Sequence, residues 1–163
     1  QGAQPIISYN YGAGNKKRVK AAFKLLLKTS MCYAAVLWLC VMLFPQVFAA
    51  MFTSDRELVE FTRTALRVYM AVMVLFGIQM ACQMTFNALG KAKEAIVVAV
   101  MRKFVLLLPL IYILPMIWKS NQTMAVYLAE PVADMFAVTF TAILFAVRFR
   151  KALAAMPNKK VEI

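Results

Sequence analysis

The sequence has no histidine and only seven acidic residues among 163. Without histidine, zinc sites and Ser–His or Cys–His catalysis lack the residue on which they usually depend. Cys32, Cys40 and Cys82 lie inside apolar runs at spacings that fit no metal motif, so we interpret them as small apolar side chains. No nucleophile with a base, and no acid pair in an aqueous loop, stands out. The sequence therefore indicates neither an enzyme nor a cofactor site.

Charged residues are scarce and apolar residues abundant, at 16% and 63% of the chain. Soluble domains usually have about 25% charged and about 45–50% apolar residues. A chain of this size cannot hide such an excess in one core, because a small domain has too much surface. Four apolar runs are long enough to cross a bilayer as helices: Leu25–Phe48, Leu66–Leu89, Ile96–Trp118 and Met124–Val147. The sequence therefore predicts an all-α integral membrane protein with four transmembrane helices.

The net charge of +12 comes from cations that are clustered between the apolar runs. Six lie in 16–28, four in 91–103 and five in 148–160. A nucleic-acid-binding domain would gather its cations on one folded face, so we exclude nucleic acid as a partner. Lys and Arg in short loops favour the cytoplasmic side, and the connections at 53–63 and 119–123 are poor in net positive charge. This alternation predicts a multi-pass protein of the cell membrane with a cytoplasmic C-terminus.

The same pattern divides the chain into four parts. Residues 1–11 are interpreted as the end of a preceding transmembrane helix, so that a membrane-spanning segment is expected before Gln1. Residues 12–24 are predicted to form a cytoplasmic basic loop, whose apolar positions could lie at the membrane surface. Residues 25–147 contain the four spans. Residues 148–163 are predicted to form a cytoplasmic tail.

Charged residues within the third and fourth runs are candidates for function, because ionisable groups are costly in a membrane. Glu130 and Asp134 are four residues apart and share a helix face, as a protonatable or cation-binding pair would require. Alternatively, the helix begins at Pro131 and leaves Glu130 in water. At about 1.5 Å per residue, Arg102 and Asp134 differ by only about 6 Å in depth, so the two could pair. The alternative is that Arg102 and Lys103 extend to the cytoplasmic surface.

A polar stripe is predicted on the second span, where Gln79, Gln83 and Asn87 follow at i, i+4 and i+8. Such a stripe cannot face lipid cheaply. It either lines a water-filled cavity or bonds to neighbouring helices as packing. Gly77, just above the stripe, permits a close helix approach or a bend.

Prolines within the spans predict bends at Pro45, Pro109 and Pro115. Broken helices are common in transporters, where freed carbonyls line a cavity. A purely structural kink is the alternative.

Three stretches of the chain resemble the multidrug and toxic compound extrusion (MATE) family, in particular its MepA-like bacterial branch. Gln4–Asn15, followed by Arg18 and Val19 in a basic run, resembles a motif of that family. Phe86–Ala92 resembles the helix end and turn after the fourth helix of a lobe. Ala129–Asp134 resembles the entry to the last helix in that branch.

The resemblance implies twelve helices in two lobes of six, which export cationic lipophilic compounds in exchange for H+ or Na+ as the coupling ion. This chain would correspond to the end of the eighth helix through the twelfth, in the C-terminal lobe. Its partners would then be the lipid bilayer, the N-terminal lobe of the same protein and cationic drug-like molecules. No family ion-site acid transfers to a position of this sequence; Glu130 and Asp134 match only a branch pattern.

The sequence therefore predicts part of a multidrug efflux transporter that works by alternating access. Two other functions remain open. One is a structural or assembly subunit of the membrane, in which the polar stripe only holds helices together. The other is a flippase for lipid-linked sugars, since such proteins share the fold.

Overall fold

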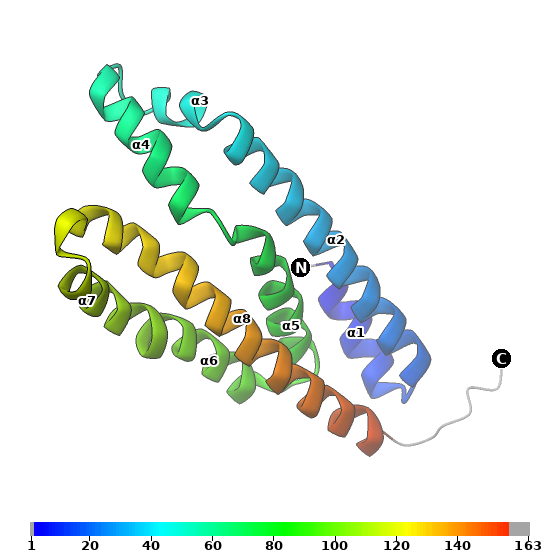
Figure 1. Cartoon of the computed structure of the whole chain (residues 1–163). Helices are drawn as coiled ribbons and strands as arrows, with labels where there is room; N and C mark the ends of the chain where they lie inside the picture. Colours follow the sequence, from blue (N-terminus) through cyan, green and yellow to red (C-terminus); the bar gives the residue numbers. More distant parts are fainter. Residues whose placement is uncertain (1, 157–163) are drawn as a thin grey trace.

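The computed structural model describes residues 2–156, and within that range all regular structure is helical. Three uninterrupted stretches are long and apolar enough to cross a membrane, and a bent pair of helices supplies a fourth. The prediction of an all-α membrane protein is confirmed (Figure 1). In chain order the elements are α1 (Ala3–Gly12), α2 (Lys16–Leu43), α3 (Pro45–Ala50), α4 (Arg56–Tyr69), η1 (Met73–Leu75), α5 (Phe76–Ala88), α6 (Ala92–Val100), η2 (Met101–Leu107, a π-helix), α7 (Leu108–Ile117), η3 (Lys119–Asn121) and α8 (Gln122–Ala155).

The first span starts earlier than the sequence suggested. Only three residues separate α1 from α2, and Gly14 in this turn has a positive φ of 75°. The Asn15 side chain then caps α2 by accepting a hydrogen bond from the backbone N–H of Arg18 at 3.1 Å. The loop predicted over 12–24 is therefore wrong for residues 16–24, which form the first turns of α2. At about 42 Å, α2 is longer than a hydrocarbon core of about 30 Å.

The apolar side of this basic segment packs on protein rather than lying at the membrane surface. Val19 is fully buried, and the centre of the Phe23 ring lies 4.6 Å from that of the Phe145 ring in α8. Phe149 stacks on Phe145 at 4.8 Å and extends the cluster along α8. This packing explains why the helix continues through its cationic turns, since tertiary contacts stabilise helices more than local propensity does.

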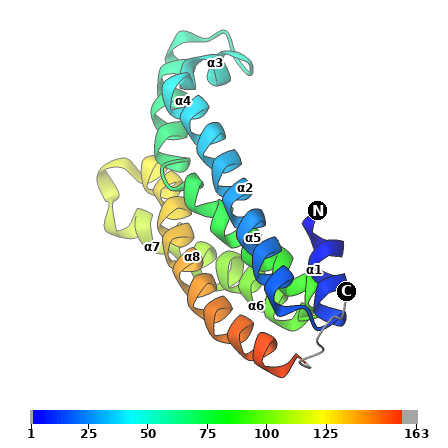
Figure 2. The same cartoon turned by 90° about the vertical axis from the view of Figure 1, so that its right-hand side faces the viewer.

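The fourth span also extends further than predicted. The helix α8 has 34 residues and runs to Ala155, so the tail predicted over 148–163 is helical in its first part. Residues 157–163 lie outside the described part of the chain. Arg148 lies 3.9 Å from Glu94 near the start of α6, while Phe149 contacts the first turns of α2. The basic segments of α2, α6 and α8 therefore share one end of the bundle (Figure 2).

The second span is broken in its middle. The run predicted over 66–89 is divided between α4 and α5, which are bent by 43° around residues 70–75. A break exposes carbonyls that water cannot satisfy inside a membrane. Here the indole N–H of Trp38 donates to the carbonyl of Ala71 at 3.1 Å. Similarly, Arg67 donates to the carbonyl of Met42 at 3.2 Å, close to where α2 ends.

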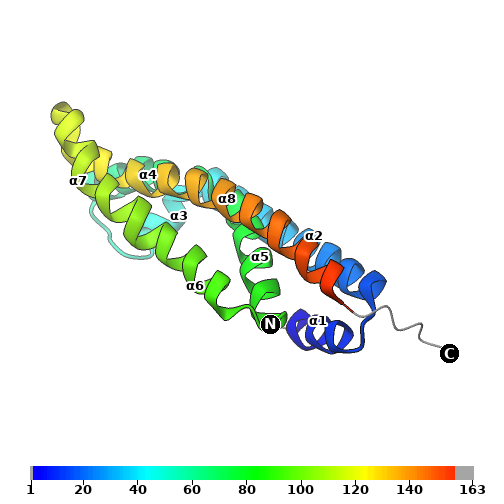
Figure 3. The ribbon, with the colours of Figure 1, turned by 90° about the horizontal axis from the view of Figure 1, so that it is seen from below.

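Two of the three expected proline bends coincide with irregular backbone. Pro45 begins the separate helix α3 after Phe44 departs from helical geometry. Pro109 follows the π-helix η2, as expected if a missing N–H donor favours a wider turn before it. Pro115 lies inside α7 without ending it. Figure 3 shows α6 and α7 approaching α8 toward the turn at Lys119.

Gly77 lies where α5 packs against α2. A Cβ atom built there would lie only 2.9 Å from the carbonyl oxygen of Ser30 and 3.1 Å from the sulfur of Met31. Of the two roles predicted for this glycine, the structure supports close helix approach. The contact holds α5, the second half of the broken span, against α2.

Candidate functional site

Charged side chains from two helices meet in the interior, on the side of the break in the second span. The Nε atom of Arg102, in η2, lies 2.5 Å from Oδ1 of Asp134 in α8. Its Nη2 atom lies 2.9 Å from Oε1 of Glu130. The three side chains are only 10–14% exposed. The pairing of Arg102 with Asp134 that the sequence suggested is therefore present, and Glu130 joins it.

The helix α8 supplies both acids from one face. It begins at Gln122 after Asn121, whose side chain accepts a hydrogen bond from the backbone N–H of Met124 at 3.1 Å. The alternative in which the helix begins at Pro131 is therefore wrong. Pro131 is instead an interior helix residue between the two acids. Because proline has no N–H, the carbonyl four residues earlier, at Tyr127, lacks its usual helical donor.

Lys103 occupies a position between the two alternatives that the sequence left open. Its Nζ atom lies 3.5 Å from Oε1 of Glu130, yet its side chain is 51% exposed. Arg102, by contrast, is turned inward. The formal charges of Arg102, Lys103, Glu130 and Asp134 sum to zero. This balance matters because an unpaired charge in a low-dielectric interior is strongly destabilising.

The broken span forms a wall beside these charges. A cavity of about 140 Å³ is lined by Tyr69, Met70, Met73, Phe76, Arg102, Glu130 and Asp134. The guanidinium carbon of Arg102 lies 4.8 Å from the centre of the Phe76 ring, which is a cation–π distance. Sequence reasoning missed the aromatic and methionine residues of this wall. No local signal marked them, since only the break brings them to the acids.

The acids keep unused acceptor capacity. Arg102 contacts one oxygen of each carboxylate, and a carboxylate has about four acceptor positions. Within residues 2–156 no hydrogen bond reaches the second oxygen of Asp134 or of Glu130. Both acids line the cavity. The second oxygens can therefore accept a proton, and both carboxylates can bind another cation if Arg102 withdraws.

The predicted stripe on α5 lies apart from this cluster. Gln79 is buried, Gln83 half-buried and Asn87 exposed, and none of the three lines the cavity beside the acids. The Oε1 atom of Gln79 has no hydrogen-bond partner among the described residues, and the same holds for Oγ1 of Thr141 on α8. The stripe thus runs from the interior toward the end of the bundle at which the basic segments lie, rather than into the charged cluster.

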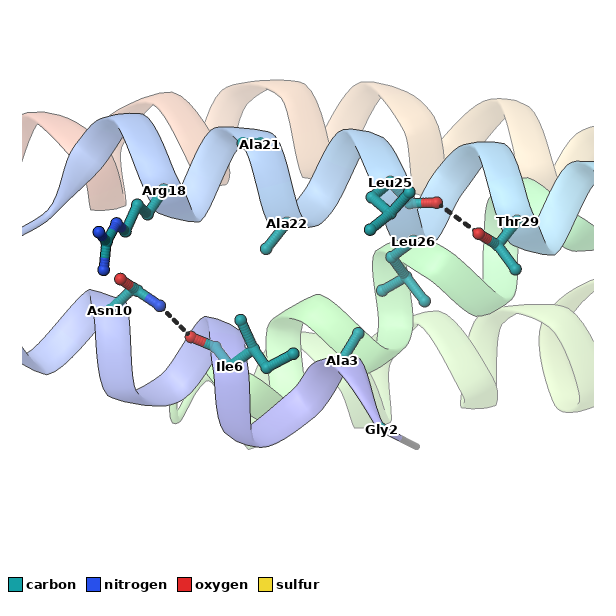
Figure 4. A pocket seen from close by; sticks show the side chains of 10 residues that line it. All are labelled: Gly2, Ala3, Ile6, Asn10, Arg18, Ala21, Ala22, Leu25, Leu26 and Thr29. Carbon is teal, nitrogen blue, oxygen red and sulfur yellow. Dashed lines mark hydrogen bonds between the residues drawn. The ribbon is translucent and has the colours of Figure 1, made fainter.

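A larger cavity, of about 660 Å³, lies between α1 and the first half of α2 (Figure 4). Its walls are mainly aliphatic, with Ile6, Leu25 and Leu26 among them. The amide of Asn10 and the hydroxyl of Thr29 each donate one hydrogen bond to a carbonyl of their own helix, and Arg18 also lines the cavity. Size alone does not make this cavity the better candidate, since the charged cluster offers the specific chemistry.

Comparisons with known proteins agree with this architecture. The family model MatE matches residues 1–113. An FAD transporter of Shewanella oneidensis is 28% identical over 106 residues, which are 65% of this chain and 24% of that protein. The multidrug export protein MepA of Staphylococcus aureus (strain N315) is 27% identical over 114 residues, or 70% of this chain and 25% of that protein. The chain thus spans about a quarter of the length of these relatives.

Solved structures extend the likeness into α8. The MATE multidrug transporter DinF-BH, in complex with rhodamine 6G, is 31% identical and superposes with a TM-score of 0.82 over 92% of this chain and 33% of its own. An inward-facing MATE transporter of the MOP superfamily shares the fold, with a TM-score of 0.85 over 95% of this chain and 36% of its own at 18% identity. The match of the family model to residues 1–113 and these structures together show that the chain belongs to the MATE (MatE) family of membrane transporters.

Proposed function

We propose that this chain forms part of the C-terminal lobe of a twelve-helix exporter that exchanges cationic lipophilic compounds for H+ or Na+ by alternating access. The observation that carries the proposal is the buried cluster of Arg102, Glu130 and Asp134 beside the broken span. Ionisable groups inside membrane spans usually mark ion or substrate pathways. Broken helices at mid-membrane depth are typical of transporter binding sites.

The relatives support a role in drug export. One is named as a multidrug export protein, and one solved structure holds rhodamine 6G. Another relative is named as an FAD transporter, so the family name alone does not define the substrate. For this chain, a cationic substrate is favoured by the two carboxylates, whose second oxygens have no hydrogen bond within the described residues. The coupling ion would use the same acids.

The proposed orientation rests on charge. The basic first turns of α2 and last turns of α8 lie at one end of the bundle, and Lys91 lies there too. An excess of Lys and Arg favours the cytoplasmic side, so we assign this end of the bundle, and the C-terminus, to the cytoplasmic side of the cell membrane. The N-terminal lobe of the same protein is the proposed partner, against which this lobe would rock.

Two other functions are less well supported. A purely structural subunit has no need for a charged cluster, because well-packed apolar residues of similar volume are often as stabilising or more so. A flippase for lipid-linked sugars must hold an anionic phosphate, whereas both acids of the cluster repel one. The only deeply buried cation near the acids, among the described residues that line the cavity, is Arg102, which they already engage.

Efflux by the full-length protein tests the proposal. The protein would be expressed in bacteria that lack their own drug pumps, and efflux of rhodamine 6G would be followed by fluorescence. We expect efflux that stops when a protonophore collapses the H+ gradient or when Na+ is removed. Absence of efflux at a normal membrane abundance would instead favour the structural role.

Sidedness is tested separately by single-cysteine variants. Asp55→Cys at the start of α4 and Lys91→Cys before α6 lie at opposite ends of the bundle (Figure 1). A membrane-impermeant maleimide applied to intact cells should label the first and spare the second. Equal labelling of both would contradict the proposed orientation.

A further inference from the structure

The cavity beside the acid pair has the lining of a binding site for an organic ammonium group. Two aromatic rings, from Tyr69 and Phe76, and two thioethers, from Met70 and Met73, line it together with the carboxylates. Aromatic faces attract cations, and rings of this kind recognise quaternary ammonium groups in other proteins. Methionine side chains are polarizable and adapt to ligands of different shape. The combination suits a cation that carries methyl or methylene groups.

We infer that this cavity binds an alkylammonium head group, and that Arg102 is a tethered cation that competes with it for Glu130 and Asp134. The inference rests on the proposed function in one respect, namely that organic cations reach this lobe. It goes further by naming the site and the chemical group, and by assigning Arg102 the role of a built-in competitor. The Arg102 guanidinium already lies where such a ligand would lie, on both carboxylates and over the Phe76 ring.

The size of the cavity limits the ligand. A dry cavity of about 150 Å³ in another protein accommodates benzene. The cavity here, at about 140 Å³, therefore has room for a group such as trimethylammonium but not for a whole dye molecule. A larger substrate would place only its cationic end between the rings and the acids. The rest would remain outside the cavity.

Charge makes binding and the Arg102 contact mutually exclusive. With Arg102 and Lys103 in place, the two acids are already neutralised. A third cation would leave an excess positive charge in a low-dielectric interior, where like charges repel strongly. The ligand can bind only when Arg102 leaves the carboxylates. The apparent Kd therefore equals the intrinsic Kd divided by the fraction of time for which Arg102 is away from the two acids.

Equilibrium dialysis of radiolabelled choline with the purified full-length protein tests the inference. If Arg102 occupies the acids about 90% of the time, Arg102→Gln should lower the apparent Kd by about tenfold. Glu130→Gln and Asp134→Asn should abolish binding. Glu94→Gln removes an acid that pairs with Lys91 and Arg148 and does not line the cavity, so this matched control should bind as the wild type does. The neutral isostere 3,3-dimethylbutan-1-ol should not respond to Arg102→Gln.

Unchanged or weaker choline binding by folded Arg102→Gln would overturn the inference. If that variant does not fold, Phe76→Leu in the presence of Arg102 decides instead. Loss of the ring should raise the Kd several-fold, and an unchanged Kd would refute the site.

Rhodamine 6G efflux, measured in parallel, separates this inference from the proposed function. If the wild type exports rhodamine 6G but Arg102→Gln does not change choline binding, the inference is overturned and the proposed function stands. A choline shift without any efflux would sustain the binding site and contradict the exporter.

Discussion

Replacing Gly77 by alanine perturbs the contact between α2 and α5 without touching the charged cluster. The added Cβ would lie 2.9 Å from the carbonyl oxygen of Ser30, whereas ordinary contacts begin at 3.4 Å. That oxygen belongs to the backbone, so it cannot rotate away, and the two helices must separate by about 0.5 Å in a close-packed interior. Overpacking of this kind costs about 1–3 kcal/mol. Alanine also gains about 1 kcal/mol in helix propensity over glycine, which offsets part of that cost.

Gly12→Ala separates the cost of overpacking from the gain in helix propensity. This glycine also lies in a helix, but a Cβ atom there meets nothing within 4 Å. We expect Gly77→Ala to be less stable than Gly12→Ala by about 1–3 kcal/mol. The free energy of unfolding would be measured for the full-length protein in detergent by denaturant titration followed by circular dichroism. Equal stability of the two variants would refute the close approach of α2 and α5.

Three further predictions use the same measurement. Asn15→Ala removes the cap of α2 and should cost about 1 kcal/mol, whereas Asn15→Ser should retain most of it. Trp38→Phe leaves the carbonyl of Ala71 unpaired at the break and should cost about 1–3 kcal/mol; no loss would mean that the break needs no external donor. Arg102→Gln should cost about 3–5 kcal/mol, because it leaves the buried Asp134 unpaired, and Asp134→Asn should cost less, because Arg102 keeps its pair with Glu130. The double variant should cost clearly less than the sum, and strict additivity would contradict the pairing.

The spans are predictable from the sequence because their cause is local. The length of an apolar run and the scarcity of charge within it follow directly from the chemistry of a lipid environment. The pairing of Arg102 with Asp134 is accessible for a similar reason, since helical rise alone places both at nearby depths. Whether Glu130 joins this pair depends on α8 continuing as a helix through Pro131, which the sequence does not reveal. A proline in a helix interior is normally disruptive, so local rules favour a helix start there.

The break in the second span could not be predicted. Residues 70–75 contain neither proline nor glycine, and the break depends on contacts with other helices, such as the donor from Trp38. The same reason applies to the aromatic and methionine residues that line the cavity, because only the break brings them to the acids. These residues are Tyr69, Met70, Met73 and Phe76. The sequence predicts a loop at the basic start of α2 and a tail at the basic end of α8, because cations dominate there. Both ends are helical because the rings of Phe23 and Phe149, which are far apart in the chain, pack together.

Dye efflux by three variants of the full-length protein, each of which loses one carboxylate, tests most directly whether the buried acids carry the cations. Glu130→Gln and Asp134→Asn remove charges from the cluster with Arg102, and Glu94→Gln removes one from the separate pairs with Lys91 and Arg148. At equal membrane abundance, we expect the first two variants to lose rhodamine 6G efflux and the third to retain it. Full efflux by both buried-acid variants would contradict the claim that this cluster carries the cations.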